Sequence, residues 1–386
     1  TGNQGISAYQ TQVYLATSNY PYGGSLSSGF SEVSWRGALN PDLKWETTDQ
    51  YNAGVDMTIL HSRINLTIDY YYKKTNDLLQ QVSIPSSTGF TSQWTNSGWV
   101  TNEGWEFSAK VYAISKPNFK WDVDGNLSFN VNKIGGLDGD QFGPELWYGI
   151  DQFFIQRNGL PIGAMFGYVE DGLYDNEAEV MADPINASVT NPSALVSEIK
   201  YRDINGDGAI TADDRTVIGD ANPDYVFGLT NSFTYKKISL SFFLQGVMGN
   251  DIFNGNLTDV VMGNIGNIPV DAYNSRWVSG ADNTDALWPK AIRSYNRNML
   301  ISDRYIEDGS YLRLKNINLG YRINPRWSGI DNIYVYGSAT NLFTITNYSW
   351  FDPDVNAFAG DASRKGVDIY SYPSSMTFSI GFKVEF

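Results

Sequence analysis

Cysteine is absent from the 386-residue chain, histidine occurs once, and basic residues are scarce beside acidic ones. Without cysteine the chain has no disulfide framework, no thiolate metal site and no cysteine nucleophile. The 27 Lys and Arg residues against 42 Asp and Glu residues give a net charge of −15, which disfavours nucleic acid as a partner. No apolar run approaches the length of about 18 residues that a transmembrane helix needs. Thr1 begins no signal peptide, so we expect any export signal to lie upstream of it.

The C-terminal segment is instead a strand with two different faces. From Met376 to Phe386 apolar and polar side chains alternate without a break, and the apolar set is Met376, Phe378, Ile380, Phe382, Val384 and Phe386. A strand of about 9 to 11 residues with one apolar face can cross a bilayer at a tilt. The final aromatic residue, Phe386, is expected to be the barrel-assembly signal at the closing seam of an outer-membrane β-barrel.

The same alternation recurs in pairs along the chain, which predicts hairpins. The pairs are residues 51–59 with 64–72, 105–113 with 121–131, 225–235 with 238–244, and 311–323 with 333–339. Together with the terminal strand they make about nine strands, with uncertain boundaries. The sequence therefore predicts an all-β fold, a membrane-spanning, antiparallel, up-and-down β-barrel.

Loop lengths and side-chain types give this barrel a direction. Links within hairpins are short, whereas residues 75–100, 132–224, 249–309 and 340–375 form long connections. Short turns are periplasmic and long loops extracellular in such barrels, which places Phe386 in the periplasm. Strand charges such as Asp56, Asp69 and Glu106 fall on the polar face, away from lipid. A soluble β-sandwich also has alternating strands, but the 25 Tyr, 20 Phe and 11 Trp residues favour interfacial aromatic girdles.

One sharp motif lies in the longest connection, residues 133–224. Residues 203–214 read DINGDGAITADD and fit the calcium-loop template D-x-N-x-D-G-x5-D/E. Calcium prefers six to eight oxygen ligands, and the spacing predicts a set made of Asp203, Asn205, Asp207, the Ala209 carbonyl and Asp214. Because aspartate replaces the usual final glutamate, we expect weak binding, about 10⁻⁴ to 10⁻³ M, in a structural role. The alternative is an acidic loop of Asx-turns that binds nothing.

Candidates for catalysis are weak. The single histidine, His61, falls in a predicted tight turn, and Asp213 with Asp214 belongs to the calcium template, so we expect no enzyme. Aromatic residues of the long connections are better candidates, because flat rings can stack on sugars or contact peptide side chains. The candidates for contact with substrate or lid are Trp94, Trp99, Trp147, Trp277, Trp288 and Trp350, although packing within the loops would explain most of them.

Five longer motifs lie along the chain: NPDLKWE at 40–46, TNEGWEF at 101–107, the run at 203–228, LRLKNINLGY at 312–321 and ATNLFTITNYSWFDPDVN at 339–356. Together they closely resemble the C-terminal barrel region of SusC/RagA-type TonB-dependent transporters. The resemblance implies the outer membrane of a Gram-negative bacterium of the Bacteroidota. It also implies a barrel of about 22 strands around a plug, powered through TonB and covered by a SusD-like surface lipoprotein. The implied cargo is an oligosaccharide or a peptide.

The strand count departs from that family. About nine to twelve strands fit in residues 1–386, so we expect the chain to be a fragment or split subunit that lacks the plug and the first half of the barrel. The strand near Tyr51 then needs a partner, because an open sheet edge in lipid leaves backbone groups unpaired. Two alternatives remain: a stand-alone, calcium-stabilised surface binding or adhesion barrel without active transport, and a surface hydrolase, for which no particular acid stands out.

Overall fold

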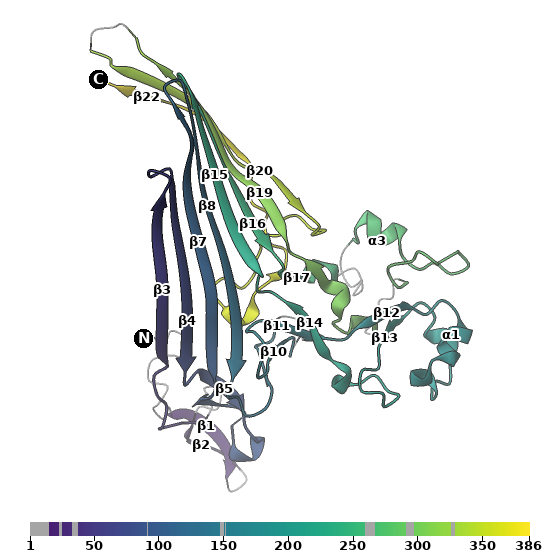
Figure 1. Cartoon of the computed structure of the whole chain (residues 1–386). Coiled ribbons are helices and arrows are strands. Elements are labelled where there is room, and N and C mark those ends of the chain that lie inside the picture. Colours follow the sequence, from purple (N-terminus) through teal and green to yellow (C-terminus); the bar gives the residue numbers. More distant parts are fainter. Residues whose placement is uncertain are drawn as a thin grey trace.

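The structure is a computed structural model, and it describes residues 15–22, 25–32, 38–90, 92–146, 150, 152–258, 267–290, 297–325 and 329–386. Its main element is a nine-stranded antiparallel sheet with the order β22-β20-β19-β16-β15-β8-β7-β4-β3 (Figure 1). The strands are β3 (Thr47–Ile59), β4 (Ile64–Asn76), β7 (Trp99–Lys116), β8 (Phe119–Gly135), β15 (Tyr225–Tyr235), β16 (Ile238–Met248), β19 (Tyr311–Ile323), β20 (Asn332–Thr346) and β22 (Thr377–Glu385). Neighbours in the sheet follow one another along the chain, as in an up-and-down barrel wall.

All four predicted hairpins and the terminal strand are confirmed. The bounds of β15 and β19 are those predicted, whereas β7 and β8 run to 18 and 17 residues, well beyond the predicted segments. About 9 to 11 residues suffice to cross a bilayer, so these two strands extend past it. They project at the end of the sheet where the long connections lie (Figure 1).

The strand register assigns every side chain to one of two faces. Leu229 lies opposite Leu244 of β16, and the next residue, Thr230, lies opposite Asp124 of β8. The apolar set thus shares one face, the outer face of a membrane barrel, and most of the polar set shares the opposite, inner face. A slip of one residue would exchange the two faces and place carboxylates such as Asp124 in lipid.

Aromatic rings gather at two heights on the outer face. Phe129 contacts Tyr225 with 5.8 Å between ring centroids, and nearer the short turns Trp121 stacks on Phe233 at 5.6 Å. Trp121 and Phe129 lie eight residues apart on β8 (129 − 121 = 8), about 27 Å of strand, or about 21 Å across the membrane at a tilt near 40°. This spacing fits two aromatic girdles around an apolar band of about 25 Å.

The short turns share one end of the sheet with the C-terminus (Figure 1). In the first turn Leu60, His61 and Ser62 have left-handed backbone, with φ of 52°, 54° and 64°, and in the third Lys236 has φ 53°. His61 is therefore a turn residue, as predicted. Arg63 donates to the carbonyls of Tyr112 and Ala113, which ties this turn to the end of β7.

The other end of the sheet carries strands that the alternation did not predict, in the long connections and in the segment before β3 (Figure 1). They are β1 (Leu15–Tyr22) with β2 (Ser25–Glu32), β5 (Leu79–Ser83) with β6 (Ser92–Asn96), the sheet of β9 (Gln141–Phe142), β10 (Phe154–Gln156), β11 (Ala164–Gly167) and β14 (Thr216–Asp220), the pair β12 (Glu170–Leu173) and β13 (Ile199–Tyr201), and β17 (Asp251–Asn254) between β18 (Ile306–Asp308) and β21 (Val367–Asp368). We call the described part of residues 136–224 and 251–308 the loop lobe. Its core is built from Leu146, Ile150, Phe153, Phe154, Met165, Ala221, Phe253 and Tyr305, and Val367 of β21 packs into it.

Within the described residues the helices are few and short. They are α1 (Glu177–Ala182), α3 (Val270–Asn274) and the 3₁₀ turns η2 (Ser86–Thr88), η3 (Pro184–Asn186), η4 (Pro192–Ala194), η5 (Ala212–Asp214), η6 (Gly255–Leu257), η7 (Arg297–Met299), η8 (Asp303–Tyr305) and η9 (Ala362–Arg364). In the part of the chain that the structure describes, no helix is both long and apolar enough to span a membrane.

A lysine on the outer face should damage the barrel far more than a lysine on the inner face of the same strand. We expect Leu229→Lys to lower the free energy of unfolding by about 2 to 4 kcal/mol, because Leu229 lies midway along β15 and faces lipid. Thr230→Lys, which faces Asp124, is the matched control and should have little effect. Urea unfolding of the full-length protein in lipid vesicles, followed by heat-modifiable migration, measures both. Equal losses in the two variants would contradict the assignment of faces.

Candidate functional site

The predicted calcium loop, residues 203–214, lies in the loop lobe between β13 and β14 and ends in η5. Gly206 and Gly208 have left-handed backbone, with φ of 77° and 81°, and nothing lies within 4 Å of where a side chain would begin at either. These two glycines are therefore needed for their conformation and not for space. The loop is wound as the template requires, with its sharp turn at Gly208.

The acidic side chains of this loop hold its own backbone. The two carboxylate oxygens of Asp203 accept hydrogen bonds from the amides of Gly206 and Gly208, at 2.6 and 2.8 Å. The Asn205 side chain accepts a hydrogen bond from the amide of Asp207 at 2.9 Å, and the Asp207 side chain accepts one from the amide of Ala209, also at 2.9 Å. Each donor is thus paired locally, in a chain of Asx-turns.

Asp214 is the last residue of the loop and is fully buried. Its carboxylate accepts from the amides of Ile204 at 3.0 Å and Thr211 at 2.7 Å, and the Thr211 side chain caps η5 in return. Burial by itself raises the pKa of Asp214, but the hydrogen bonds from Thr211, Asn205 and Ile204 outweigh it and hold the pKa below its ordinary range. Asp214 is therefore ionised at neutral pH although it is buried.

The donor types and the winding of this loop suit calcium, but the carboxylates do not converge. Among the described residues, no group of three or more His, Cys, Asp or Glu side chains lies close enough together to hold a metal ion. Asn205 also donates to the second oxygen of Asp207 at 3.0 Å, which a metal ligand would have to give up. The loop is thus preformed in its backbone and not in its ligand sphere.

The candidate tryptophans lie in different surroundings. Trp99 begins β7 and covers Gly135, where an added Cβ would collide with the indole, and the Lys74 ammonium lies 4.8 Å from its ring centroid. This side chain therefore packs on the wall. Trp94 is half-buried in β6, and Trp147 lies outside the described residues.

Trp277 and Trp288 lie side by side through their backbones. The amide of Trp277 donates to the carbonyl of Trp288 at 2.7 Å. Among the described residues the indole nitrogen of Trp277 has no hydrogen-bond partner. The guanidinium of Arg304 lies 4.9 Å from the ring centroid of Trp288. Among the predicted tryptophans that the structure describes, Trp288 lines an open hollow.

That hollow has a volume of about 410 Å³ and is lined by Glu170, Gly172, Leu287, Trp288, Asp303 and Arg304. Arg304 pairs with both oxygens of Glu170 and also donates to the Leu287 carbonyl, so its guanidinium is largely engaged. Burial raises the pKa of Glu170, against the opposing effect of Arg304. The sequence pattern did not point to Glu170 or Arg304, which lie far apart along the chain.

The remaining predicted residues lie at the edges of the fold. Trp350 follows β20 and meets the ring of Phe351 edge-on, with 5.2 Å between centroids. Phe386 follows the last residue of β22, Glu385, and is 86% exposed. Asp213, the neighbour of the buried Asp214, is exposed at the surface of η5. No described contact brings Trp350 or Phe386 together with Trp288 or with the 203–214 loop.

Comparisons with known proteins agree with this architecture. The family model described as TonB dependent receptor-like, beta-barrel, matches residues 4–342. The TonB-dependent receptor P3 of Formosa agariphila is 32% identical over 100% of this chain, which covers 38% of that relative. The TonB-dependent receptor SusC of Bacteroides thetaiotaomicron is 31% identical over 95% of this chain and 34% of its own length.

A solved structure, that of the RagAB peptide transporter, superposes with a TM-score of 0.75 at 24% identity, over 100% of this chain and 40% of that chain. At this identity the likeness shows a shared fold. This chain spans well under half the length of the relatives that it matches. The resemblance inferred from the sequence motifs is confirmed: the chain belongs to the TonB-dependent receptor-like β-barrel family, in its SusC/RagA type.

Proposed function

We propose that this chain forms the C-terminal part of the barrel wall of a TonB-dependent outer-membrane importer of oligosaccharides or peptides. The observation that carries the proposal is the nine-stranded sheet with an apolar outer face, short turns at one end and a folded loop lobe at the other. The family match and the relatives named TonB-dependent receptor support it. A receptor or transporter family offers no support for an enzyme.

The two outer strands of the sheet require partners. In the described part of the chain neither β3 nor β22 has a neighbour on its outer side. Unpaired backbone groups cost several kcal/mol each in hydrocarbon, so both edges must pair before the wall can stand in lipid. The remaining barrel strands and a plug are the proposed partners. A stand-alone adhesion barrel would have to close on these nine strands.

The direction of the wall follows from its ends. The C-terminus and the short turns would face the periplasm, where the plug meets TonB, and the loop lobe would face the outside. A surface lipoprotein of the SusD type would close over the loop lobe. Support for a two-component assembly comes from the neighbouring structure described as the RagAB peptide transporter. The organisms of the relatives favour the outer membrane of a member of the Bacteroidota.

Cargo would meet the loop lobe first. The hollow beside Trp288 combines an aromatic residue with the carboxylate of Asp303, which can accept hydrogen bonds from sugar hydroxyls or from peptide amines, next to the Glu170–Arg304 pair. Trp277 and Trp350 stay secondary candidates, and Trp94 and Trp99 are better explained by packing. The chemistry of the hollow suits both cargo classes.

Calcium at the 203–214 loop would stiffen the loop lobe. The predicted ligands Asp203, Asn205, Asp207, the Ala209 carbonyl and Asp214 would have to draw together around the ion. The preformed turns at Gly206 and Gly208 support this proposal, since they lower the conformational cost of binding. The ion would supply positive charge and rigidity, with no chemical step assigned to it.

The open edges predict that the wall does not assemble alone. Extracted from its native outer membrane, the folded particle should contain a polypeptide longer than these 386 residues, or a tightly bound piece with the missing strands. Intact mass measurement and N-terminal sequencing of the folded particle test this. A folded, membrane-inserted particle that holds these 386 residues and nothing more would contradict the proposal.

The calcium proposal predicts a chelator effect that depends on two acids. In the full-length protein, removal of calcium should speed protease cleavage within residues 203–214, because the acids lose the ion that draws them together. Asp203→Ala combined with Asp207→Ala should cleave rapidly with or without chelator. The matched control is Asp213→Ala, an exposed acid of the same loop that the template does not use. If chelator leaves the cleavage rate of the wild-type loop unchanged, the proposal of a calcium site is wrong.

Asp214 predicts how the loop responds to acid. Because its folded pKa is depressed, its contribution is fully present above the ordinary aspartate pKa of about 3.9 and is lost as pH falls through the lower, folded value. Asp214→Asn should weaken the loop by about 1 to 3 kcal/mol at neutral pH and remove this acid transition. Pepsin cleavage of the full-length protein between pH 2 and pH 5 measures both effects. If the acid transition persists unchanged in Asp214→Asn, a group other than Asp214 causes it and the prediction is wrong.

A further inference from the structure

The segment between β20 and β22, residues 347–376, which we call the inner segment, meets the barrel wall around one buried cation, Arg313. Two weaker contacts lie beside it: Lys315 is 3.8 Å from Asp354, and Asn341 donates to the Ser375 carbonyl at 3.0 Å. Arg313 of β19 lies opposite Gln245 of β16 and Thr344 of β20, on the inner face of the sheet. Its side chain is 2% exposed although it carries a permanent charge. A cation that is buried in this way must be paired.

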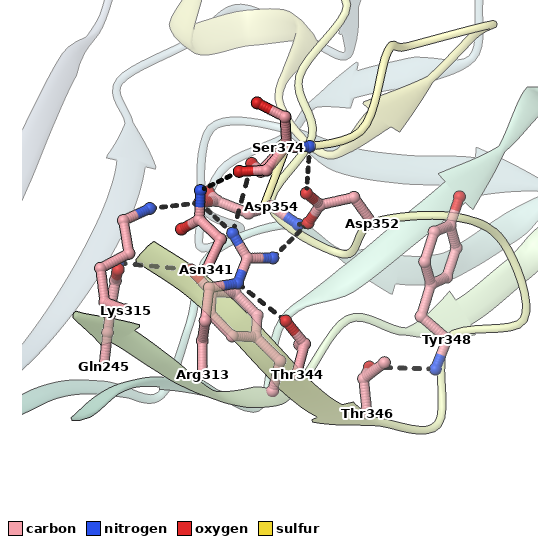
Figure 2. A network of polar contacts seen from close by, with 12 residues as sticks. Gln245, Arg313, Lys315, Asn341, Thr344, Thr346, Tyr348, Asp352, Asp354 and Ser374 are labelled. Carbon is pink, nitrogen blue, oxygen red and sulfur yellow. Dashed lines mark hydrogen bonds and ion pairs between the residues drawn. The ribbon is translucent and has the colours of Figure 1, made fainter. Parts of the chain in front are cut away.

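All the anionic partners of Arg313 come from the inner segment (Figure 2). One guanidinium nitrogen pairs with Asp352, and the other lies 3.3 Å from Asp354 and 3.4 Å from the Ser374 hydroxyl. The third nitrogen, Nε, donates to Thr344 of the wall at 2.9 Å. Arg313 therefore binds both the start of the inner segment, at Asp352 and Asp354, and its end, at Ser374.

Asp352 completes this junction. Its second carboxylate oxygen accepts from the amide of Ser374 at 2.8 Å, and the oxygen that faces Arg313 accepts from the amide of Asp354 at 2.9 Å. Burial raises the pKa of Asp352, yet these amides and the guanidinium hold it below its ordinary range. The carboxylate is thus ionised where it meets the cation. We call Arg313, Asp352, Asp354 and Ser374 the latch.

The far end of the inner segment is anchored differently, in the loop lobe. Within it β21 pairs in parallel with β17, and Val367 and Phe253 share the apolar core of the lobe. Buried Asn256, next to β17, accepts from the amide of Tyr370 at 2.7 Å. The inner segment thus joins two bodies, with an apolar and backbone joint at the lobe and an ionic joint at the wall.

We infer that Arg313 is a releasable latch that fixes the inner segment, and through it the loop lobe, to the inner face of the barrel wall. The two joints differ in how they can be undone. Parting β21 from β17 would expose core residues and break backbone hydrogen bonds, whereas parting Arg313 from Asp352 requires only that water or another charged group replaces each partner. Of the two joints, the joint at the wall therefore separates more readily.

This inference deepens the proposed import function, on which its physiological meaning rests, but its test reads the resting protein without cargo. Hydrogen exchange of the full-length transporter would be followed in peptides of the inner segment and of β17. Arg313→Gln should raise exchange at residues 350–356 and 371–376 by about tenfold or more and leave β17 unchanged. Asp352→Asn should act in the same direction, and the double variant should add little to either, since both remove one interaction.

The matched control is Arg322→Gln, an exposed arginine at the opposite end of β19. It should leave exchange of the inner segment unchanged. If Arg313→Gln fails to assemble, Asp354→Asn removes one partner of the cation and should give a smaller rise confined to the same peptides. Exchange in Arg313→Gln equal to that of the wild type, or a rise spread equally over β17 and the inner segment, would overturn the latch. Loss of cargo uptake with normal exchange would instead concern the import proposal.

Discussion

Everything in this fold depends on one constraint, that backbone amides and carbonyls within a bilayer have no water to bind and must pair with each other. A sheet meets it by pairing each strand with two neighbours, and the register of this sheet does so from β4 to β20. The same register sends alternate side chains to lipid and to the interior, which explains why Leu229 and Asp124 belong to opposite faces. Where β7 and β8 leave the bilayer, water can satisfy the backbone again, and irregular structure begins.

The wall could be predicted from the sequence because apolar and polar side chains alternate along each strand with a period of two residues. Each predicted wall segment spans at least seven residues, which is long enough for the period to show although single positions such as Phe243 interrupt it. The strands of the loop lobe could not be predicted in this way. β10 and β13 have three residues each, too few to show a period, and their ends are set by contacts with distant strands. The hairpin of β5 and β6 was hidden for the same reason inside a predicted connection.

The candidate site divides along the same line. The turns of the 203–214 loop are formed by hydrogen bonds between residues close in sequence, so its glycines and aspartates were enough to predict them. Arg313, in contrast, pairs with Asp352 and Ser374, which lie 39 and 61 residues away. The arrangement of Trp288 with Arg304 and Glu170 is also long-range. Aromatic residue type alone could not separate Trp288, which lines a hollow, from Trp99, which covers a glycine of the wall.

The polar character of the inner face explains why the wall holds the inner segment by charge. An apolar anchor on this face would break the alternation that keeps the interior polar and the exterior apolar. An ion pair of the Arg313 type fits the alternation, but desolvation offsets much of its Coulomb attraction, so its net contribution to stability is small. Its contribution is directional. The guanidinium binds Asp352, Asp354 and Thr344 in a fixed geometry, and this geometry allows only one position of the inner segment on the wall. A joint of this kind positions the segment firmly and still separates at a modest cost in free energy.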